Sequence, residues 1–296
     1  MQSNPELPTV AFIGLGVMGF PMSGHLAKAG YPVQVYNRSS DKAQRWAEQY
    51  SGTVCATPRA AAQDAQCVFT CVGNDDDLRA VLLGEQGALA GLEEGAVVVD
   101  HSTVSVEVCE ELAELCQQRK ASFVDAPISG GQQGAENGVL TVMCGGSQTA
   151  LTKATAAIDC YASAVTHLGP VGSGQRCKMV NQICIAGLLQ GLAEGLNFAQ
   201  RAGLDPAQVV DVISRGAAQS WQMENRAATM LADHYEHGFA VDWMVKDLGI
   251  AQAEAARNGS QLPVAATVAT YYQELQKRGG GRWDTSSLLR LLQTEQ

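Results

Sequence analysis

The sequence predicts an α/β domain with a parallel sheet, joined by a long helix to an all-α domain. Three observations support this organisation. Strand-like and helix-like segments alternate through roughly the first 170 residues, which is typical of a parallel sheet with helices on both faces. A glycine-rich turn follows the first strand-like segment. After Gly174 no strand-like pattern returns, and apolar residues recur at helical spacing.

In the first part of the chain, strands are expected where short apolar runs are bounded by turn residues. These runs are Val10–Ile13, Val33–Tyr36, Cys67–Val72, Ala96–Asp100 and Ser122–Asp125. Helices are expected between them at Met18–Ala29, Asp41–Tyr50, Asp76–Leu83 and Ser105–Gln118. The segments that follow predict a return strand at Val139–Cys144, a helix from Gln148 and a strand at Ala164–Leu168.

The second part begins with a proline-free segment, Gln175–Ala202, that predicts one helix about 42 Å long, enough to leave one domain and enter another. Asp205 and Pro206 then provide an N-cap and a first helical residue. Further helices are expected at Pro206–Ser214, Ser220–Leu231, Trp243–Arg257, Pro263–Lys277 and Thr285–Leu292. We therefore expect a Rossmann-like domain at 1–171, an interdomain helix at 172–202 and an all-α domain at 203–296.

Composition excludes several classes of function. The chain has 296 residues, 46% hydrophobic and 17% charged, which is typical of a globular protein. Its net charge of −10 argues against a nucleic acid or an anionic membrane as partner. The nine cysteines form no paired C-x-x-C set and no His cluster has ligand spacing, so we expect no metal site. Scattered cysteines and the absence of a signal-like N-terminus predict a reducing, cytoplasmic location.

The glycine-rich turn reads Gly14-x-Gly16-x-x-Gly19, between a predicted strand and a predicted helix. The first glycine permits a tight turn, the second lets the backbone approach a pyrophosphate, and the third lets helix and strand pack closely. The N–H groups at the helix start then face the phosphates. The context favours a dinucleotide site over a glycine turn without a ligand, and the predicted contacts are Gly14, Leu15, Gly16, Val17, Met18 and Gly19.

The end of the second strand bears on the choice of cofactor. An NAD site usually has a carboxylate there, whereas this chain has Asn37, Arg38, Ser39 and Ser40. Arg38 can pair with a 2′-phosphate and the serines can donate to it, which favours NADP(H) over NAD(H). The alternative is that Arg38 stacks on the adenine or points to water.

Two glycine-rich loops follow late strands, where open α/β sheets bind their ligands. In the first, Ser129, Gly130 and Gly131 offer consecutive N–H groups that suit a substrate carboxylate; a plain turn is the alternative. The second opens the long helix and carries Lys178, with Asn181 and Gln182 on the same face. A partly buried lysine near a helix N-terminus has a lowered pKa, as a general acid or base requires, although most lone lysines simply point to water.

Taken together, these motifs resemble the β-hydroxyacid dehydrogenase family, which includes 3-hydroxyisobutyrate dehydrogenase, tartronate semialdehyde reductase and, more distantly, 6-phosphogluconate dehydrogenase. Four motifs in the same order carry the resemblance, which extends from about Thr9 to Leu292. They are GLGVMGFPMSGHLAKAG (14–30), DAPISGG (125–131), GSGQRCKMVNQ (172–182) and KDLGIAQAEA (246–255).

The resemblance implies a role for each matching residue. Lys178 would be the catalytic acid/base, and Ser129, Gly130 and Gly131 would hold the substrate. Thr103 would lie near both nicotinamide and substrate. Backbone contacts to the cofactor would come from Val72, Gly73 and Asn74, and Lys246 would reach it from the helical domain, although taken alone it is equally a solvated helix residue.

The chain departs from the family pattern at two places. Gln182 stands where the family usually has Asn, so either Asn181 or Gln182 orients the substrate hydroxyl. Val72-Gly73 replaces a frequent Leu-Pro. Trp221, Phe239 and Trp243 are candidate walls for the substrate, or plain core residues.

The function expected is therefore NADP(H)-dependent interconversion of a small β- or γ-hydroxyacid and its aldehyde acid. The alternatives are imine reduction and a non-catalytic cofactor-binding module; relatives of both kinds usually lose the lysine. The long helix has glycines at 187, 191 and 195, a stripe on which another helix can pack. Together with the resemblance, the stripe suggests a homodimer or homotetramer.

Overall fold

The computed structural model describes residues 7–293 and divides into two compact units between Lys178 and Met179. We refer to them as the N-terminal unit and the C-terminal unit. The boundaries expected at residues 171 and 202 stay predictions.

The N-terminal unit contains a nine-stranded sheet. Its strands are β1 (Val10–Ile13), β2 (Val33–Tyr36), β3 (Thr53–Val54), β4 (Cys67–Thr70), β5 (Val97–Asp100), β6 (Ser122–Asp125), β7 (Ile128–Ser129), β8 (Leu140–Gly146) and β9 (Ala162–Gly169). The first six strands are parallel in the order β3-β2-β1-β4-β5-β6. This order places the point where the connections reverse direction between β1 and β4, as in a Rossmann fold.

Strand β8 extends the sheet as the return strand that the sequence predicts. It runs antiparallel to β6 and to the two-residue β7, and β9 then adds parallel to β8. The helix between β8 and β9 is α7 (Gln148–Ile158).

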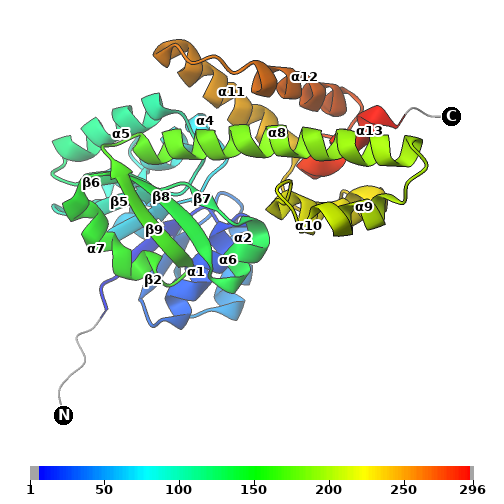
Figure 1. Ribbon diagram of the computed structural model, residues 1–296. Coiled ribbons are helices and arrows are strands. Elements are labelled where there is room, and N and C mark those ends of the chain that lie inside the picture. The colour runs from blue at the N-terminus through cyan, green and yellow to red at the C-terminus, as the bar shows by residue number, and fades with distance from the viewer. Residues whose placement is uncertain (1–6, 294–296) are drawn as a thin grey trace. The chain divides into compact units, whose positions relative to one another are not determined.

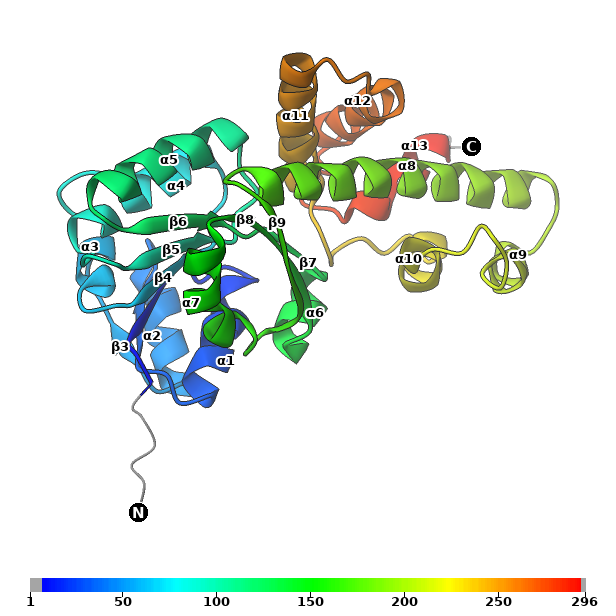
Figure 2. The same cartoon turned by 60° about the vertical axis from the view of Figure 1, so that its left-hand side comes forward.

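Helices cover both faces of this sheet (Figures 1 and 2). One face packs against α1 (Gly19–Lys28), α2 (Ser40–Gln49), α6 (Gly131–Asn137) and α7. The other packs against α3 (Pro58–Ala62), α4 (Asp75–Leu82), the short 3₁₀ helix η1 (Ala88–Ala90) and α5 (Val106–Gln118). In β1, Val10 and Phe12 enter the first core and Ala11 and Ile13 the second, so this strand is buried on both sides.

In the described part of the C-terminal unit the regular elements are helices, and Ala240 and Asp284 form an isolated antiparallel bridge. Helix α8 (Ser173–Arg201) begins in the N-terminal unit and supplies its later turns to this unit's core. The other elements are α9 (Pro206–Ile213), α10 (Trp221–Leu231), α11 (Val241–Asn258), α12 (Pro263–Lys277), the 3₁₀ helix η2 (Thr285–Leu288) and α13 (Leu289–Leu292). Leu189, Leu196, Met244 and Tyr272 are among the residues of its core. The predicted fold class, a Rossmann-like α/β domain followed by an all-α domain, is confirmed.

The elements that differ from the predicted ones are short. The sequence did not predict β3, α3, β7 and α6, which have two to seven residues and too few positions for a periodic pattern. The segment Thr285–Leu292, expected as one helix, is a 3₁₀ turn followed by a short α-helix.

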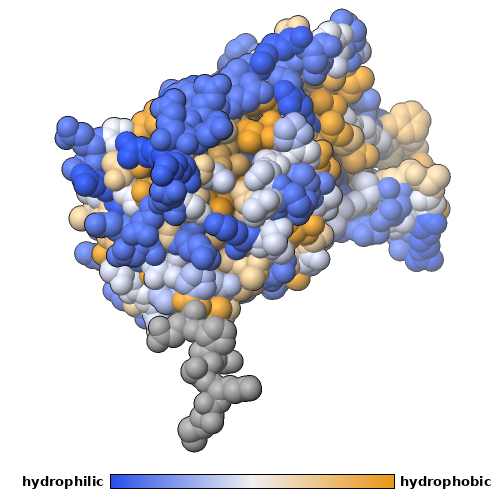
Figure 3. Space-filling model, turned by 90° about the vertical axis from the view of Figure 1, so that its left-hand side faces the viewer, coloured by the Kyte–Doolittle hydropathy of each residue, from blue (hydrophilic) through white to orange (hydrophobic). Residues whose placement is uncertain are grey.

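Between residues 7 and 293, no helix combines the length and hydropathy needed to span a membrane. Hydrophilic residues cover much of the surface drawn in Figure 3, and apolar residues show between them in patches.

Candidate active site

The glycine turn after β1 has the shape of a phosphate-binding loop. Gly14 has φ of +100°, and a Cβ there would collide with the carbonyl oxygen of Cys71. A Cβ on Gly19 would collide with the carbonyl oxygen of Gly14. At Gly16, by contrast, an added Cβ would meet no atom of the described residues within 4 Å, so the space over this residue is open. A turn with no room for a side chain at Gly14 and Gly19, and with free space over Gly16, fits a pyrophosphate at the start of α1.

Asn37, at the end of β2, stabilises this turn by hydrogen bonds. Its Oδ1 accepts a hydrogen bond from the Leu15 N–H at 2.8 Å, and its Nδ2 donates to the Ser39 carbonyl at 3.0 Å. The Leu15 N–H, which we expected to contact the cofactor, is therefore engaged by Asn37. The sequence gives no sign of this contact because 22 residues separate the two partners.

Arg38 lies on the surface next to Asn37. Its side chain is 82% exposed and its Nη1 pairs with Asp77 Oδ1 at 2.8 Å. Exposed ion pairs of this kind contribute about 0–1 kcal/mol, so Asp77 holds Arg38 only weakly.

The loop after β4 is fixed by two side chains. The Val72 N–H donates to Ser102 Oγ at 2.9 Å, and Asn74 caps α4 by accepting from the Asp77 N–H at 2.8 Å. Asn74 therefore has a structural role in addition to the cofactor contact that the family resemblance implies.

Asp100, the last residue of β5, is a fully buried carboxyl group that the sequence analysis did not single out. Its Oδ1 accepts from Thr70 Oγ1 and from Ser102 Oγ, both at 2.7 Å, while Oδ2 has no hydrogen-bond partner among the described residues. Burial raises the pKa of Asp100 to about 7, against the opposing effect of these hydrogen bonds.

His101 follows directly and is also buried. Its ring lies between the Ala126 carbonyl and the Tyr161 hydroxyl, at 2.6 and 2.8 Å, and stacks on Phe69. Burial lowers the pKa of His101 to about 4, so it is a neutral structural side chain that fixes the loop after β5. Thr103, the predicted nicotinamide and substrate contact, lies in this loop and is partly exposed.

At the end of β6, the buried carboxylate of Asp125 holds the start of α8. Its Oδ1 accepts from the Gly172 N–H at 2.7 Å and its Oδ2 from the Gln175 N–H at 2.9 Å. Burial raises the pKa of Asp125, and the backbone N–H groups partly offset that effect. Lys178 lies one turn further along α8 and is 8% exposed. The alternative in which this lysine simply points to water does not fit that burial.

Ser129, Gly130 and Gly131 occupy the end of β7 and the start of α6. Gly130 and Gly131 have φ of +128° and +62°, a conformation that favours glycine at both positions. Both glycines are exposed and Ser129 is partly exposed. The segment is thus a strand followed by a short helix, where the sequence indicated only a loop.

In the C-terminal unit, a second polar cluster surrounds the buried carboxylate of Asp247 on α11. Gln182 Nε2 donates to Asp247 Oδ2 at 2.6 Å, and Asn181 Nδ2 donates to Gln182 Oε1 at 2.7 Å. Lys246 Nζ lies 3.2 Å from Asp247 Oδ1 and 5.8 Å from the centre of the Trp243 ring. The structure thus brings together Asn181, Gln182 and Lys246 around a carboxylate that the sequence analysis missed.

The three aromatic candidates of this unit are all exposed, so none is plain core. The guanidinium of Arg226 lies 5.0 Å from the Trp221 ring and pairs with the buried Asp284 at 3.3 Å. Asp284 Oδ2 also accepts from the Phe239 N–H at 2.8 Å. Arg226 and Asp284 therefore support Trp221 and Phe239, a role that only the tertiary structure reveals.

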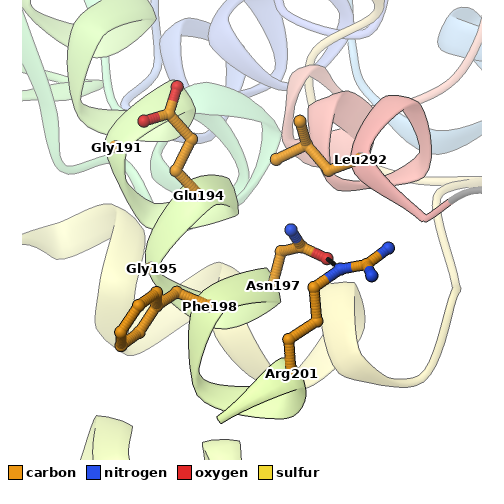
Figure 4. Close-up of a pocket in the computed structure, with 7 residues that line it drawn as sticks. All are labelled: Gly191, Glu194, Gly195, Asn197, Phe198, Arg201 and Leu292. Carbon is orange, nitrogen blue, oxygen red and sulfur yellow. Dashed lines mark hydrogen bonds between the residues drawn. The ribbon is translucent and has the colours of Figure 1, made fainter.

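A surface pocket lies elsewhere in the C-terminal unit, between the end of α8 and Leu292 (Figure 4). Gly191, Glu194 and Phe198 line it, and Arg201 Nε donates to Asn197 Oδ1 at 3.4 Å. It contains none of the predicted site residues. A Cβ added at Gly191 or Gly195 would meet nothing within 4 Å, so no helix in the described part of the chain packs closely there. The homodimer or homotetramer stays a prediction.

Across residues 7–293, no three His, Cys, Asp or Glu side chains gather as a metal site. The candidate groups that the structure does show are a glycine turn, a buried lysine and glycine-rich loops.

Family models match both parts of the chain. Residues 9–169 match the NAD-binding domain of 6-phosphogluconate dehydrogenase. Residues 172–292 match the family described as NAD-binding of NADP-dependent 3-hydroxyisobutyrate dehydrogenase.

Individual proteins resemble the chain over nearly its full length. An uncharacterized oxidoreductase of Shewanella frigidimarina is 60% identical, covering 96% of this chain and 98% of that protein. The mitochondrial 3-hydroxyisobutyrate dehydrogenase of Mus musculus is 31% identical, covering 97% and 88%.

Solved structures agree with these matches. The Mycobacterium tuberculosis 3-hydroxyisobutyrate dehydrogenase, solved with L-serine, has a TM-score of 0.89 at 27% identity, covering 97% of this chain and all of that one. Psf3 in complex with NADP+ and 2-OPP has a TM-score of 0.88 at 26% identity, covering 96% and 100%. A Pseudomonas imine reductase, at 20% identity, 97% and 100% coverage and a TM-score of 0.63, shares the fold alone. The chain therefore belongs to the β-hydroxyacid dehydrogenase family and is an NAD(P)-dependent oxidoreductase.

Proposed function

We propose that this enzyme interconverts a small β- or γ-hydroxyacid and its aldehyde acid with NADP(H), and that Lys178 is the general acid/base. The observation that carries the proposal is the burial of Lys178, 8% exposed, one turn inside a helix whose start is bound to the end of β6. A buried lysine with a fixed helix register suits proton transfer to one atom of a bound substrate.

The substrate carboxylate would bind at Ser129, Gly130 and Gly131. Support comes from the exposure of the two glycines, which have no side chain to shield their backbone N–H groups. Thr103, on the loop after β5, would contact the same substrate beside the nicotinamide. This arrangement suits a short hydroxyacid in which only a few bonds separate the carboxylate from the reacting carbon.

A bound nicotinamide cofactor would supply hydride transfer, which interconverts the carbinol carbon and the carbonyl carbon of the substrate. Lys178 would take the proton from the substrate hydroxyl in the oxidative direction and donate it to the carbonyl oxygen in the reductive direction. Ser129, Gly130 and Gly131 keep the far end of the substrate fixed while the proton moves.

The C-terminal unit would contribute Asn181 and Gln182 to orient the substrate hydroxyl, Lys246 to contact the cofactor, and Trp221 and Phe239 as walls. The hydrogen bond from Gln182 to Asp247 occupies one end of the Gln182 amide, and Asn181 donates to its other end. Asn181 uses one of its two Nδ2 hydrogens in this contact and can donate the other to the substrate oxygen, which makes it the better candidate to orient the hydroxyl.

Arg38 would select NADP(H) by pairing with the 2′-phosphate. Its ion pair with Asp77 is exposed and weak, so a doubly charged phosphate can displace it. We expect Arg38→Ala to raise the KM for NADPH roughly 10-fold, the loss of about one charge-assisted hydrogen bond, and to leave the KM for NADH unchanged. Arg45→Ala, an exposed arginine on α2, is the matched control. An equal rise of the KM for NADPH and the KM for NADH in Arg38→Ala would contradict this role.

The proposed function is tested by following NADPH oxidation at 340 nm with a panel of carbonyl compounds. Glyoxylate, succinic semialdehyde, methylmalonate semialdehyde and tartronate semialdehyde represent the proposed class, and cyclic imines the alternative reaction. We expect turnover with at least one aldehyde acid and none with the imines. Turnover with imines alone, or with no member of the panel, would overturn the proposal.

A further inference from the structure

Gln175, on the first turn of α8, makes two side-chain hydrogen bonds to one loop. The residue is fully buried. Its Nε2 donates to the Ser102 carbonyl at 2.8 Å, and its Oε1 accepts from the Val104 N–H at 3.2 Å. The two bonds lie on either side of Thr103, so the amide pairs with this loop as a neighbouring strand would.

The backbone of Gln175 is fixed as firmly as its side chain. Its N–H donates to Asp125 Oδ2, and the Gly172 N–H donates to Oδ1 of the same carboxylate. Gly174 leaves no room at this point, because a Cβ there would lie 2.8 Å from the carbonyl oxygen of Asp125. The first turn of α8 is therefore held against the end of β6.

Lys178 follows Gln175 by three residues, which places the two side chains on neighbouring positions of the same helix face. On the other side of the loop, Ser102 Oγ accepts from the Val72 N–H and donates to Asp100. One hydrogen-bonded path thus runs from the helix that carries Lys178, through Gln175, to the Thr103 loop and on to Val72.

We propose that Gln175 is a positioning residue that keeps Thr103 in register with Lys178. The inference rests on the proposed roles of those two residues. Gln175 itself touches neither substrate nor cofactor. Its amide is suited to the task because the buried Ser102 carbonyl and Val104 N–H need one donor and one acceptor, and a carboxamide supplies both from a single side chain.

The variant Gln175→Met keeps a side chain of similar length and removes both hydrogen bonds. We expect kcat to fall roughly 10- to 100-fold, as for a displacement of about 1 Å at a reacting centre, with the cofactor Kd unchanged within about twofold. Gln190→Met is the matched control: Gln190 is also buried on α8, but its amide donates to Glu194 within the helix. We expect this control to keep the wild-type kcat.

Two further measurements separate positioning from general damage to the fold. Hydrogen exchange should show the Val104 amide losing protection in Gln175→Met, while the Gly172 amide, bound to Asp125, stays protected. In a double-mutant cycle, Thr103→Val should reduce kcat by much less in the Gln175→Met background than in the wild type, because Gln175 acts through Thr103.

Full protection of the Val104 amide in Gln175→Met would overturn the inference. So would a double variant whose loss of kcat equals the product of the losses in the two single variants. The exchange measurement needs no turnover. Its result therefore distinguishes failure of this inference from failure of the proposed function, which the panel of carbonyl compounds tests.

Discussion

Replacing Lys178 by alanine is expected to lower kcat by roughly 10²- to 10⁴-fold, the usual contribution of a general acid or base. The substitution removes the buried amine from the second turn of α8 and leaves Asp125 and its hydrogen bonds to the start of that helix in place. The cofactor Kd should change little, because the glycine turn and Arg38 are untouched.

The measurement is steady-state kinetics with the best aldehyde acid of the panel, together with a fluorescence titration of NADPH binding. Lys153→Ala is a suitable control, since Lys153 is an exposed lysine of the same unit that donates to the Gly95 carbonyl. Turnover within a few-fold of wild type in Lys178→Ala would remove this lysine from the mechanism.

The second large effect is on stability and concerns Asp100. Its pKa of about 7, raised from 3.8 by burial, means that the folded protein holds a proton here between about pH 4 and 7 that the unfolded chain has released. Unfolding then releases a proton, so the contribution of Asp100 to stability falls as the pH rises through this window. Three pKa units correspond to about 4 kcal/mol as an upper bound.

Asp100→Asn removes this titration and keeps an acceptor for Thr70 and Ser102. We expect the variant to match the wild type near pH 4 and to become more stable than it by up to about 4 kcal/mol near pH 8, measured as the free energy of unfolding in urea. His101, whose pKa is lowered to about 4, gives the opposite dependence between pH 4 and 6.5. It is present in both proteins, so its effect cancels in the difference.

Asp159→Asn, at an exposed aspartate, is the control and should show no such change. A difference between Asp100→Asn and the wild type that stays constant from pH 4 to 8 would show that Asp100 does not titrate in this range.

The sequence could predict the features that depend on residues close together in the chain. Val10–Ile13 and Val33–Tyr36 are strands with the predicted bounds, because apolar runs between turn residues are a local signal. The spacing of Gly14 and Gly19 likewise predicts the tight turn and the close packing that the structure shows, while the approach of a pyrophosphate at Gly16 stays a prediction. Pro206 after Asp205 predicted the start of α9 for the same reason, and the Asp205 side chain accepts from the Ala207 N–H.

The features that it could not predict depend on partners far apart in the chain. Gln175 contacts Ser102 from 73 residues away, and Gln182 reaches Asp247 across 65 residues. Asp284 contacts Phe239 from 45 residues away. No periodicity or turn motif marks such pairs, because the contact arises only when the elements pack. The buried carboxyl group of Asp100 falls in the same class, since a strand-terminal aspartate reads as a solvated turn residue.

The most direct test of the account is a crystal structure of the enzyme with NADP⁺ and an unreactive hydroxyacid analogue. We expect Lys178 Nζ within hydrogen-bond distance of the analogue's hydroxyl oxygen, roughly 2.6–3.2 Å, and the analogue's carboxylate on Ser129, Gly130 and Gly131. An amine turned into solvent, away from both the analogue and the nicotinamide ring, would contradict it.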